Sequence, residues 1–256
     1  MLARHAISDA DWARIEHRLP GRPGQPGWVA VDNRLFFDAV LWIGRTGAPW
    51  RDLPERFGKW NSAWRRFDRW ATKGTWQIVF DALQDPDLEW RIVDSTVIRA
   101  HPCAAGAKKK ADGTGGQENQ ALGRSRGGFG TKIHGAVSGL GLPARLILTG
   151  GQESDVGQAL PLIEGVPFEV VIGDKGYDSK EVVAAIEKAG GEAVIPSRKN
   201  AAVPRATDWA RYKDRNLVER FWSKVKQYRR VATRFEKKGR NFLAFVQVAS
   251  IMILLR

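Results

Sequence analysis

Cysteine is almost absent from this chain of 256 residues, which contains only one, Cys103. A single cysteine excludes an internal disulfide framework and a cysteine-rich zinc site, and it fits a reducing cytosol. No nearby His or Asn constellation would activate its thiol, so we do not expect a nucleophile. Histidine is also scarce. The four residues show no metal-ligand spacing and are expected to be structural or on the surface: His5, His17, His101 and His134.

Long hydrophobic runs are missing as well. The longest, from Phe242 to Leu255, is interrupted by Gln247 and Ser250. It is too short for a membrane-spanning helix and predicts a buried core helix instead. The first residues are polar and charged, unlike a secretory signal peptide. We therefore expect a cytoplasmic protein with no membrane segment.

Acidic residues are in deficit, because 28 Asp and Glu stand against 41 Lys and Arg, for a net charge of +13. The excess is localised. Residues 196–240 hold fifteen basic and four acidic side chains, and residues 99–134 hold seven and two. Localised positive charge predicts a polyanionic partner, nucleic acid before membrane. A hydrophobic content of 43%, with 11 tryptophans, is enough for a folded core and excludes global disorder.

Residues 1–84 have a helical pattern and form the first predicted domain. Helices are expected after the capping residues Ser8 and Asp32, from Asn61 or Ser62, and from Thr75. In the third of these helices, Trp64, Phe67 and Trp70 face inward, and three arginines face outward: Arg65, Arg66 and Arg69.

A short element over residues 50–57, the turn at Gly58 and this arginine-bearing helix have the outline of a DNA-binding helix-turn-helix. A plain helical bundle with solvated arginines fits the same pattern. Both interpretations stay open at this point.

Residues 85–256 form the second predicted domain, after the proline-containing link at residues 84–87. The pattern predicts an α/β fold with a mixed five-stranded sheet and flanking helices. Strands are expected at residues 90–98, 131–138, 144–148, 168–172 and 192–195. Helices are expected at residues 156–163, 178–189, 212–226 and 242–255. A basic, Gly- and Lys-rich insertion at about residues 101–130 is expected to have no core of its own.

Two acidic residues occur where the predicted strands are otherwise apolar. Asp94 interrupts the first strand, and Asp174 directly follows the fourth. A carboxylate in an apolar strand is costly unless it is neutralised, and a bound cation is one candidate. Reactive groups in open α/β sheets gather at the carboxyl ends of strands. The alternative is that each Asp is satisfied by local backbone or by a lysine such as Lys175.

A third acid lies on the helix expected at residues 212–226. Tyr212, Arg215, Glu219 and Lys226 fall within a wedge of about 60° on one face. The opposite face is predicted to dock into a core through Leu217, Phe221, Val225 and Tyr228. By itself this pattern also fits an ordinary amphipathic helix in which Glu219 pairs with Arg215.

Taken together, Asp94, Asp174 and Glu219 are oxygen ligands without cysteine or paired histidines. Such a set favours a hard cation, Mg²⁺ or Mn²⁺, over zinc. Two such ions would activate an attacking oxygen and stabilise a leaving oxygen in phosphoryl transfer, while the basic segments hold the phosphodiester backbone.

These motifs resemble a known family. The run Asp94-Ser95-Thr96, the run from Gly173 to Asp178, and the Tyr-x2-Arg-x3-Glu-x6-Lys spacing closely resemble the DDE transposases of bacterial insertion sequences. The branch usually called insertion-sequence family five is the most similar. The resemblance covers essentially the whole chain, including the leader motif at residues 50–58 and the loop at residues 123–128.

The resemblance implies an RNase H-like second domain in which the three acids are catalytic and bind two Mg²⁺ ions, with Mn²⁺ as a substitute. It implies a first domain that recognises terminal inverted repeats, cleavage of the transposon ends, joining of the 3′-hydroxyl to target DNA, and a homodimer on paired ends. DNA contacts are then expected from the outward arginines 65, 66 and 69 and from Tyr212, Arg215, Lys224, Lys226, Lys108, Lys109, Arg124 and Arg126.

Two other functions remain open from the sequence. One is a non-catalytic DNA-binding protein derived from a transposase, against which the intact acidic triad argues. The other is a Mg²⁺-dependent nuclease that cuts without transposition.

Overall fold

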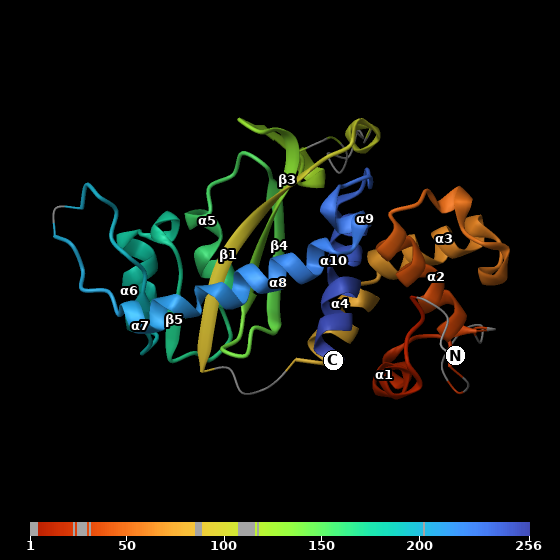
Figure 1. Ribbon diagram of the computed structural model, residues 1–256, viewed down its shortest axis with the longest axis horizontal. Helices are drawn as coiled ribbons and strands as arrows, with labels where there is room; N and C mark the ends of the chain where they lie inside the picture. The colour runs from red at the N-terminus through yellow and green to blue at the C-terminus, as the bar shows by residue number, and fades with distance from the viewer. Residues whose placement is uncertain are drawn as a thin grey trace. The chain divides into compact units, whose positions relative to one another are not determined.

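The chain folds into two compact units in a computed structural model that describes residues 5–22, 24, 30, 32–84, 89–106, 116, 118–201 and 203–256 (Figure 1). The helical unit comprises Met1–Leu83, His101–Ala107 and Val225–Arg256, and the sheet unit comprises Gln84–Ala100 and Lys108–Lys224. The predicted boundary after residue 84 lies one residue from the first boundary between the units. The C-terminal segment, predicted to belong to the second domain, packs within the helical unit instead.

The helical unit forms largely where the sequence pattern predicts. It contains α1 (Asp9–Ile15), α2 (Asn33–Thr46), α3 (Trp60–Thr72), α4 (Thr75–Asp81), α9 (Arg229–Ala232) and α10 (Gly239–Leu254), with short 3-10 helices η1 (Glu16–Arg18), η2 (Trp50–Asp52), η3 (Glu55–Phe57) and η4 (Pro102–Ala105). Ser8 and Asp32 cap α1 and α2, accepting hydrogen bonds from Asp11 N at 3.0 Å and Leu35 N at 2.8 Å. The cap expected at Asn61 or Ser62 is wrong, because Lys59 occupies the N-cap position of α3.

Helix α10 explains why the chain end joins this unit. Most of its residues are buried, including Phe242 and Phe245. The ring of Phe245 packs against Phe67 of α3 with centroids 4.5 Å apart, and against Trp50 at 6.2 Å. A helix that is apolar around most of its circumference needs enclosure by other elements. The aromatic side chains of the N-terminal helices provide that enclosure.

A buried ion pair holds the segment between α9 and α10. Arg230 Nε donates to Glu236 Oε1 at 2.6 Å, with side-chain exposures of 9% and 6%. Arg230 also donates to the carbonyl oxygens of Gly47 and Ala48, both at 3.2 Å. Burial raises the pKa of Glu236 despite the adjacent guanidinium. The segment after α9 is thereby attached to the end of α2.

The sheet unit contains a mixed six-stranded sheet. Its strands are β1 (Trp90–Arg99), β2 (Gly123–Ser125), β3 (Gly128–Val137), β4 (Pro143–Gly150), β5 (Val170–Ile172) and β6 (Glu192–Val194). The order is β2-β3-β1-β5-β6, and β4 also pairs with β3. Strand β1 is antiparallel to β3 and parallel to β5, which is parallel to β6. The five predicted strands are present, and β2 is the sixth.

Strand β2 lies inside the predicted insertion. It pairs with the start of β3 as a hairpin, from Gly123 opposite Gly130 to Ser125 opposite Gly128. A short 3-10 helix, η5 (Glu118–Gln120), precedes it, and Leu122 is buried. The expectation of an insertion without packed structure is therefore wrong for residues 118–130. Lys108 and Lys109 lie outside the described residues.

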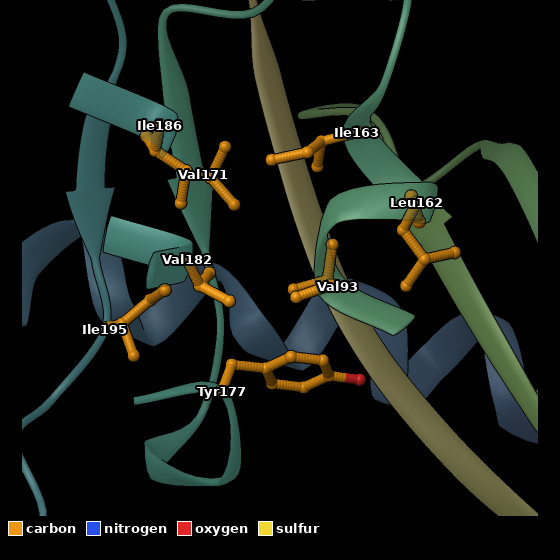
Figure 2. Close-up of a cluster of buried hydrophobic side chains, with 10 residues drawn as sticks. Val93, Leu162, Ile163, Val171, Tyr177, Val182, Ile186 and Ile195 are labelled. Atoms are coloured by element: carbon orange, nitrogen blue, oxygen red, sulfur yellow. The ribbon is translucent and has the colours of Figure 1, made fainter. Parts of the chain in front are cut away.

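Helices cover both faces of the sheet. On one face, α5 (Val156–Ile163) and α6 (Lys180–Lys188) pack over a cluster of apolar side chains that includes Val93, Val171 and Tyr177 (Figure 2). Tyr177 ends the 3-10 helix η6 (Lys175–Tyr177). The chain then continues through α7 (Trp209–Tyr212) and η7 (Lys213–Arg215) into α8 (Asn216–Lys226), which crosses β1 in Figure 1. No helix among the described residues is long and apolar enough to cross a membrane.

His134, in the middle of β3, is a fully buried histidine. Its Nε2 lies 2.8 Å from Thr149 Oγ1, and its Nδ1 has no hydrogen-bond partner among the described residues. Burial lowers its pKa to about 4 and outweighs the opposing effect of Asp155. His134 is therefore a structural residue of the sheet, which is one of the two roles, structural or surface, that the sequence predicts for the histidines.

The buried ion pair gives a first testable prediction. Glu236→Gln removes the negative charge while keeping the shape, which leaves the buried Arg230 without a counter-charge. We expect a loss of about 3 kcal/mol in the free energy of unfolding of the helical unit, measured by urea denaturation. Asp9→Asn is the matched control, because the Asp9–Arg34 pair has Asp9 90% exposed. A Glu236→Gln variant as stable as that control would contradict the assignment.

His134 gives a second prediction, on pH. The unfolded imidazole takes up a proton near pH 6.5, whereas the folded one stays neutral until about pH 4. The free energy of unfolding should therefore fall by about 2 to 3 kcal/mol between pH 7 and pH 4.5 through this residue. His134→Gln should flatten that part of the profile, and His17→Gln, at an exposed position, should not. Equal slopes in the wild type and His134→Gln would contradict the prediction.

Candidate active site

The sheet places Asp94 and Asp174 at equivalent positions on neighbouring parallel strands. Ile92 of β1 is the register partner of Ile172 of β5. Each aspartate lies two residues further along its strand direction. Asp94 lies in the middle of β1 and Asp174 just beyond the carboxyl end of β5, so the parallel pairing places the two residues level with each other. Burial raises the pKa of Asp94, and the negative charge of Asp174 adds to this effect.

Asp94 is held by two donors from the helical segment that crosses β1. Arg215 donates to Oδ1 at 3.3 Å, and Trp222 Nε1 donates to Oδ2 at 3.1 Å. The side chains of Asp94 and Arg215 are 17% and 18% exposed. Burial raises the pKa of Asp94 more than Arg215 lowers it. The carboxylate raises the pKa of Arg215 despite burial, so the guanidinium stays charged.

Asp174 is satisfied differently. It occupies the N-cap position of η6, where Oδ1 accepts from Gly176 N at 2.8 Å. Lys175, the lysine considered as its partner, is exposed, and the ion pairs of the described chain include none between the two. The alternative that nearby backbone groups satisfy each aspartate is therefore correct for Oδ1 of Asp174. An arginine and an indole N–H satisfy Asp94.

The predicted helix over residues 212–226 is present, with a 3-10 turn between α7 and α8. The ring of Tyr212 and the guanidinium of Arg215 lie together, with the centroid 5.7 Å from Cζ and the hydroxyl 3.5 Å from Nη1. Glu219 is exposed on α8. The suggested pairing of Glu219 with Arg215 does not form, because Arg215 binds Asp94 instead.

The buried face of α8 differs from the predicted one. Phe221 and Val225 are buried as expected, but Leu217 is only half-buried, and Val218 and Trp222 complete the face. Tyr228 is buried beyond the end of α8, beneath the Arg45 guanidinium of the helical unit. The buried stripe of α8 is rotated toward the face that carries Arg215 and Glu219. This rotation brings Trp222 beside Asp94.

Trp222 is the site residue that sequence reasoning missed. A Cβ atom at Gly135, the register partner of Asp94, would lie 2.7 Å from the Trp222 ring. The missing side chain on β3 therefore makes room for the indole, whose N–H reaches the carboxylate. Two sequence features could have pointed to Trp222: it stands seven residues after Arg215, and a glycine interrupts an apolar strand.

The three predicted acids have the chemistry that a hard divalent cation needs, but their side chains are not arranged as a metal site in this structure. Carboxylate oxygens are the ligands that Mg²⁺ and Mn²⁺ prefer. Among the described residues, however, no three Asp, Glu, His or Cys side chains are close enough to hold a metal ion. The structure places Asp94 and Asp174 level on neighbouring parallel strand segments and leaves the Glu219 side chain exposed.

The other residues expected at DNA fall into three groups. Exposed side chains are those of Arg65, Arg69, Arg124, Arg126, Lys224 and Lys226. Arg66 is an exception, because it packs over the rings of Phe36 at 4.4 Å and Trp70 at 5.0 Å, and burial lowers its pKa to about 10. It also donates to the Asp32 carbonyl at 3.3 Å and to Asn33. The expectation that Arg66 faces outward is wrong. Lys108 and Lys109 are not described.

Several basic side chains of the segment 196–240 are buried or paired within the fold. Arg230 and Arg234 are buried, and Arg205 and Arg211 form ion pairs with Asp178 and Glu192, both at 2.5 Å. The exposed basic side chains of this segment in the sheet unit are Arg198, Lys199, Lys213, Arg220 and Lys224. The solvent-facing charge is therefore smaller than the sequence total suggests.

Comparisons with known proteins match both parts of the chain. A family model described as "Transposase DDE domain" matches residues 85–254, and one described as "Putative transposase of IS4/5 family" matches residues 7–80. The second model covers the leader whose motif at residues 50–58 was likened to the insertion-sequence transposases.

Several curated proteins are similar over part of the chain. A putative transposase for insertion sequence element IS6501 from Brucella ovis is 40% identical over 131 residues, covering 49% of this chain and 98% of the relative. An uncharacterized protein, y4sN, from Sinorhizobium fredii is 42% identical over 108 residues, covering 42% and 86%. A putative transposase for element IS402 from Burkholderia cepacia is 32% identical, covering 48% and 62%.

The family model for the DDE domain spans well over half of the chain, and the resemblance inferred from the acidic motifs is confirmed. This chain belongs to the DDE transposase family of bacterial insertion sequences.

Proposed function

We propose that this protein binds the terminal inverted repeats of an insertion sequence, cleaves the element's ends and joins the freed 3′-hydroxyl to target DNA. The observation that supports the proposal most is that Asp94 within β1 and Asp174 just after the parallel strand β5 lie level with each other, with Arg215 bound to Asp94 and Tyr212 beside Arg215. Carboxylates flanked by a guanidinium and an aromatic ring suit a phosphodiester substrate.

In this proposal each side chain has a distinct task. Asp94, Asp174 and Glu219 would hold the divalent ions, and Glu219 reaches them from the exposed face of α8. Bound Mg²⁺ or Mn²⁺ would supply activation of the attacking oxygen and stabilisation of the leaving oxygen. Trp222 orients the Asp94 carboxylate. Tyr212, Arg215, Lys224 and Lys226 would contact phosphates or end nucleotides next to the cut.

Recognition of the element's ends is assigned to the helical unit. Arg65 and Arg69 lie four residues apart on the exposed side of α3, where two guanidinium groups can contact one stretch of DNA backbone. Arg124 and Arg126, exposed on the β2–β3 hairpin, are proposed as further DNA contacts. Because two ends must be cut and joined together, the proposed assembly is a homodimer on paired ends. The RNase H-like character of the sheet unit belongs to the same proposal.

The acids can be tested one at a time. Asp94→Asn, Asp174→Asn and Glu219→Gln should each lower Mg²⁺-dependent cleavage of inverted-repeat DNA by about a thousandfold, since each removes charge from the reacting centre. End binding, measured by fluorescence anisotropy, should stay near wild type. Glu192→Gln, at an exposed acid of the same unit, is the control and should cleave normally. Full cleavage by any of the three variants would refute the site.

The arginines of α3 give a further test. Arg65→Ala and Arg69→Ala should weaken binding to end DNA and lower the salt dependence of the binding constant by about one counter-ion each. Arg66→Ala should lower the melting temperature instead, because its guanidinium packs over Phe36 and Trp70. Unchanged DNA affinity in the double variant of Arg65 and Arg69 would contradict the proposed surface.

Product analysis separates the proposal from its two alternatives. Joined strand-transfer products support transposition, and cuts without joining support a nuclease. Specific end binding with no cleavage in Mg²⁺ or Mn²⁺ supports a DNA-binding protein that has lost its chemistry.

A further inference from the structure

Asp155 is an acid whose position the proposed function does not explain. It occupies the N-cap position of α5, yet its side chain makes no capping hydrogen bond to the helix. Its Oδ1 instead accepts from Ser95 Oγ at 2.6 Å and from Lys132 Nζ at 3.0 Å, and it lies 3.6 Å from His134 Nδ1. An N-cap Asp whose carboxylate turns to the sheet gives up the stabilising hydrogen bond that it could make to the first turn of its helix.

The hydrogen bond from Ser95 links Asp155 to the proposed catalytic strand. Ser95 directly follows Asp94, and successive side chains in a strand point to opposite faces. Asp94 faces α8 and Ser95 faces α5. The backbone at residues 94–95 is therefore held from both sides, by Trp222 and Arg215 on one face and by Asp155 on the other.

Asp155 is itself fixed by buried neighbours. Lys132 also donates to the carbonyl of Glu153 at 2.6 Å, and its side chain is 12% exposed. His134, the register partner of Ser95, is fully buried and contacts Thr149 through Nε2. These contacts give the carboxylate little freedom to move, so it can restrain Ser95 in turn.

Tyr177 lies within electrostatic range of Asp155 and of the proposed catalytic acids Asp94 and Asp174. Its ring packs in the apolar cluster between α5, α6 and the sheet, with the hydroxyl directed toward β1 (Figure 2). The hydroxyl is buried and has no hydrogen-bond partner in the part of the chain that the structure describes. Burial raises its pKa, and the charges of Asp155, Asp94 and Asp174 raise it further. The three carboxylates therefore lie within electrostatic range of one hydroxyl.

We propose that Asp155 is a positioning residue that acts through Ser95 to fix the orientation of Asp94. The role rests on the proposed function, because Asp94 is the group that it positions. Partners of this kind, one step removed from the reacting groups, typically change activity by about tenfold to a hundredfold when removed. A residue that only stabilised the fold would change the melting temperature without changing the geometry at Asp94.

The Trp222 indole N–H reports on Asp94 without DNA, metal or catalysis, because it donates directly to that carboxylate. Its ¹H–¹⁵N resonance can be assigned by its loss in Trp222→Phe. In protein free of DNA and metal, Ser95→Ala and Asp155→Asn should move this resonance toward weaker hydrogen bonding. Ser95→Thr, which keeps the hydroxyl, should restore it, and Glu192→Gln should leave it unchanged.

The same variants are then tested in single-turnover cleavage of end DNA at saturating Mg²⁺. Ser95→Ala and Asp155→Asn should each slow cleavage by about tenfold to a hundredfold with end binding near wild type. The melting temperature should stay near wild type in Ser95→Ala and fall modestly in Asp155→Asn, because Lys132 loses its counter-charge. The double variant should be no slower than the slower single variant, because both act on one linkage.

Three results would overturn the positioning role. They are an unmoved Trp222 resonance, movement of most indole resonances together with a large drop in melting temperature, and multiplicative effects in the double variant. If the wild-type protein does not cleave, the proposed function fails, and the Trp222 resonance still decides whether Asp155 positions Asp94.

Discussion

A single half-buried carboxylate constrains much of the sheet unit. Asp94 interrupts an apolar strand, and a charge in that environment must be paired with donors or it would be strongly destabilising. Helix α8 and the turn before it supply both donors, Trp222 and Arg215, so the crossing of this helix over β1 is coupled to the acid. Gly135 on the neighbouring strand leaves the space that the indole needs. The parallel pairing of β1 with β5 then places Asp174 at the same edge.

The two donors differ in a way that suits the proposed chemistry. The Trp222 ring is buried between α8 and β3, and its hydrogen bond to Asp94 is the shorter of the two. Arg215 is longer and more flexible, and it also contacts the Tyr212 hydroxyl. A rigid donor fixes the direction of the carboxylate, and a mobile guanidinium can turn to a phosphate when substrate arrives. Glu219 stands one helical turn after Arg215 and is exposed. In the proposed function, DNA would approach from this side.

The sequence predicts the element order well because capping residues, glycines and a change of hydrophobic period mark the boundaries locally. Ser8, Asp32 and the apolar strands are of this kind, and so are Asp94 within one strand and Asp174 just after another. Long-range pairing is less visible. Nothing local shows that α10 packs with the N-terminal helices, that Arg66 packs over Phe36, or that residues 123–125 pair with β3. Trp222 and Asp155 were missed for the same reason, since their contacts lie 128 and 60 residues away in sequence. The family resemblance added the chemistry, which the residue pattern left open between an ion site and local pairing.

The central claim is that Asp94, Asp174 and Glu219 share divalent ions once an element end is bound. Anomalous scattering from Mn²⁺ in crystals of the protein with inverted-repeat DNA tests it most directly. The account predicts anomalous peaks among these three carboxylates and next to the scissile phosphate. Peaks that avoid Asp94 and Asp174, or a Glu219 side chain that stays in solvent away from any bound ion, would contradict it.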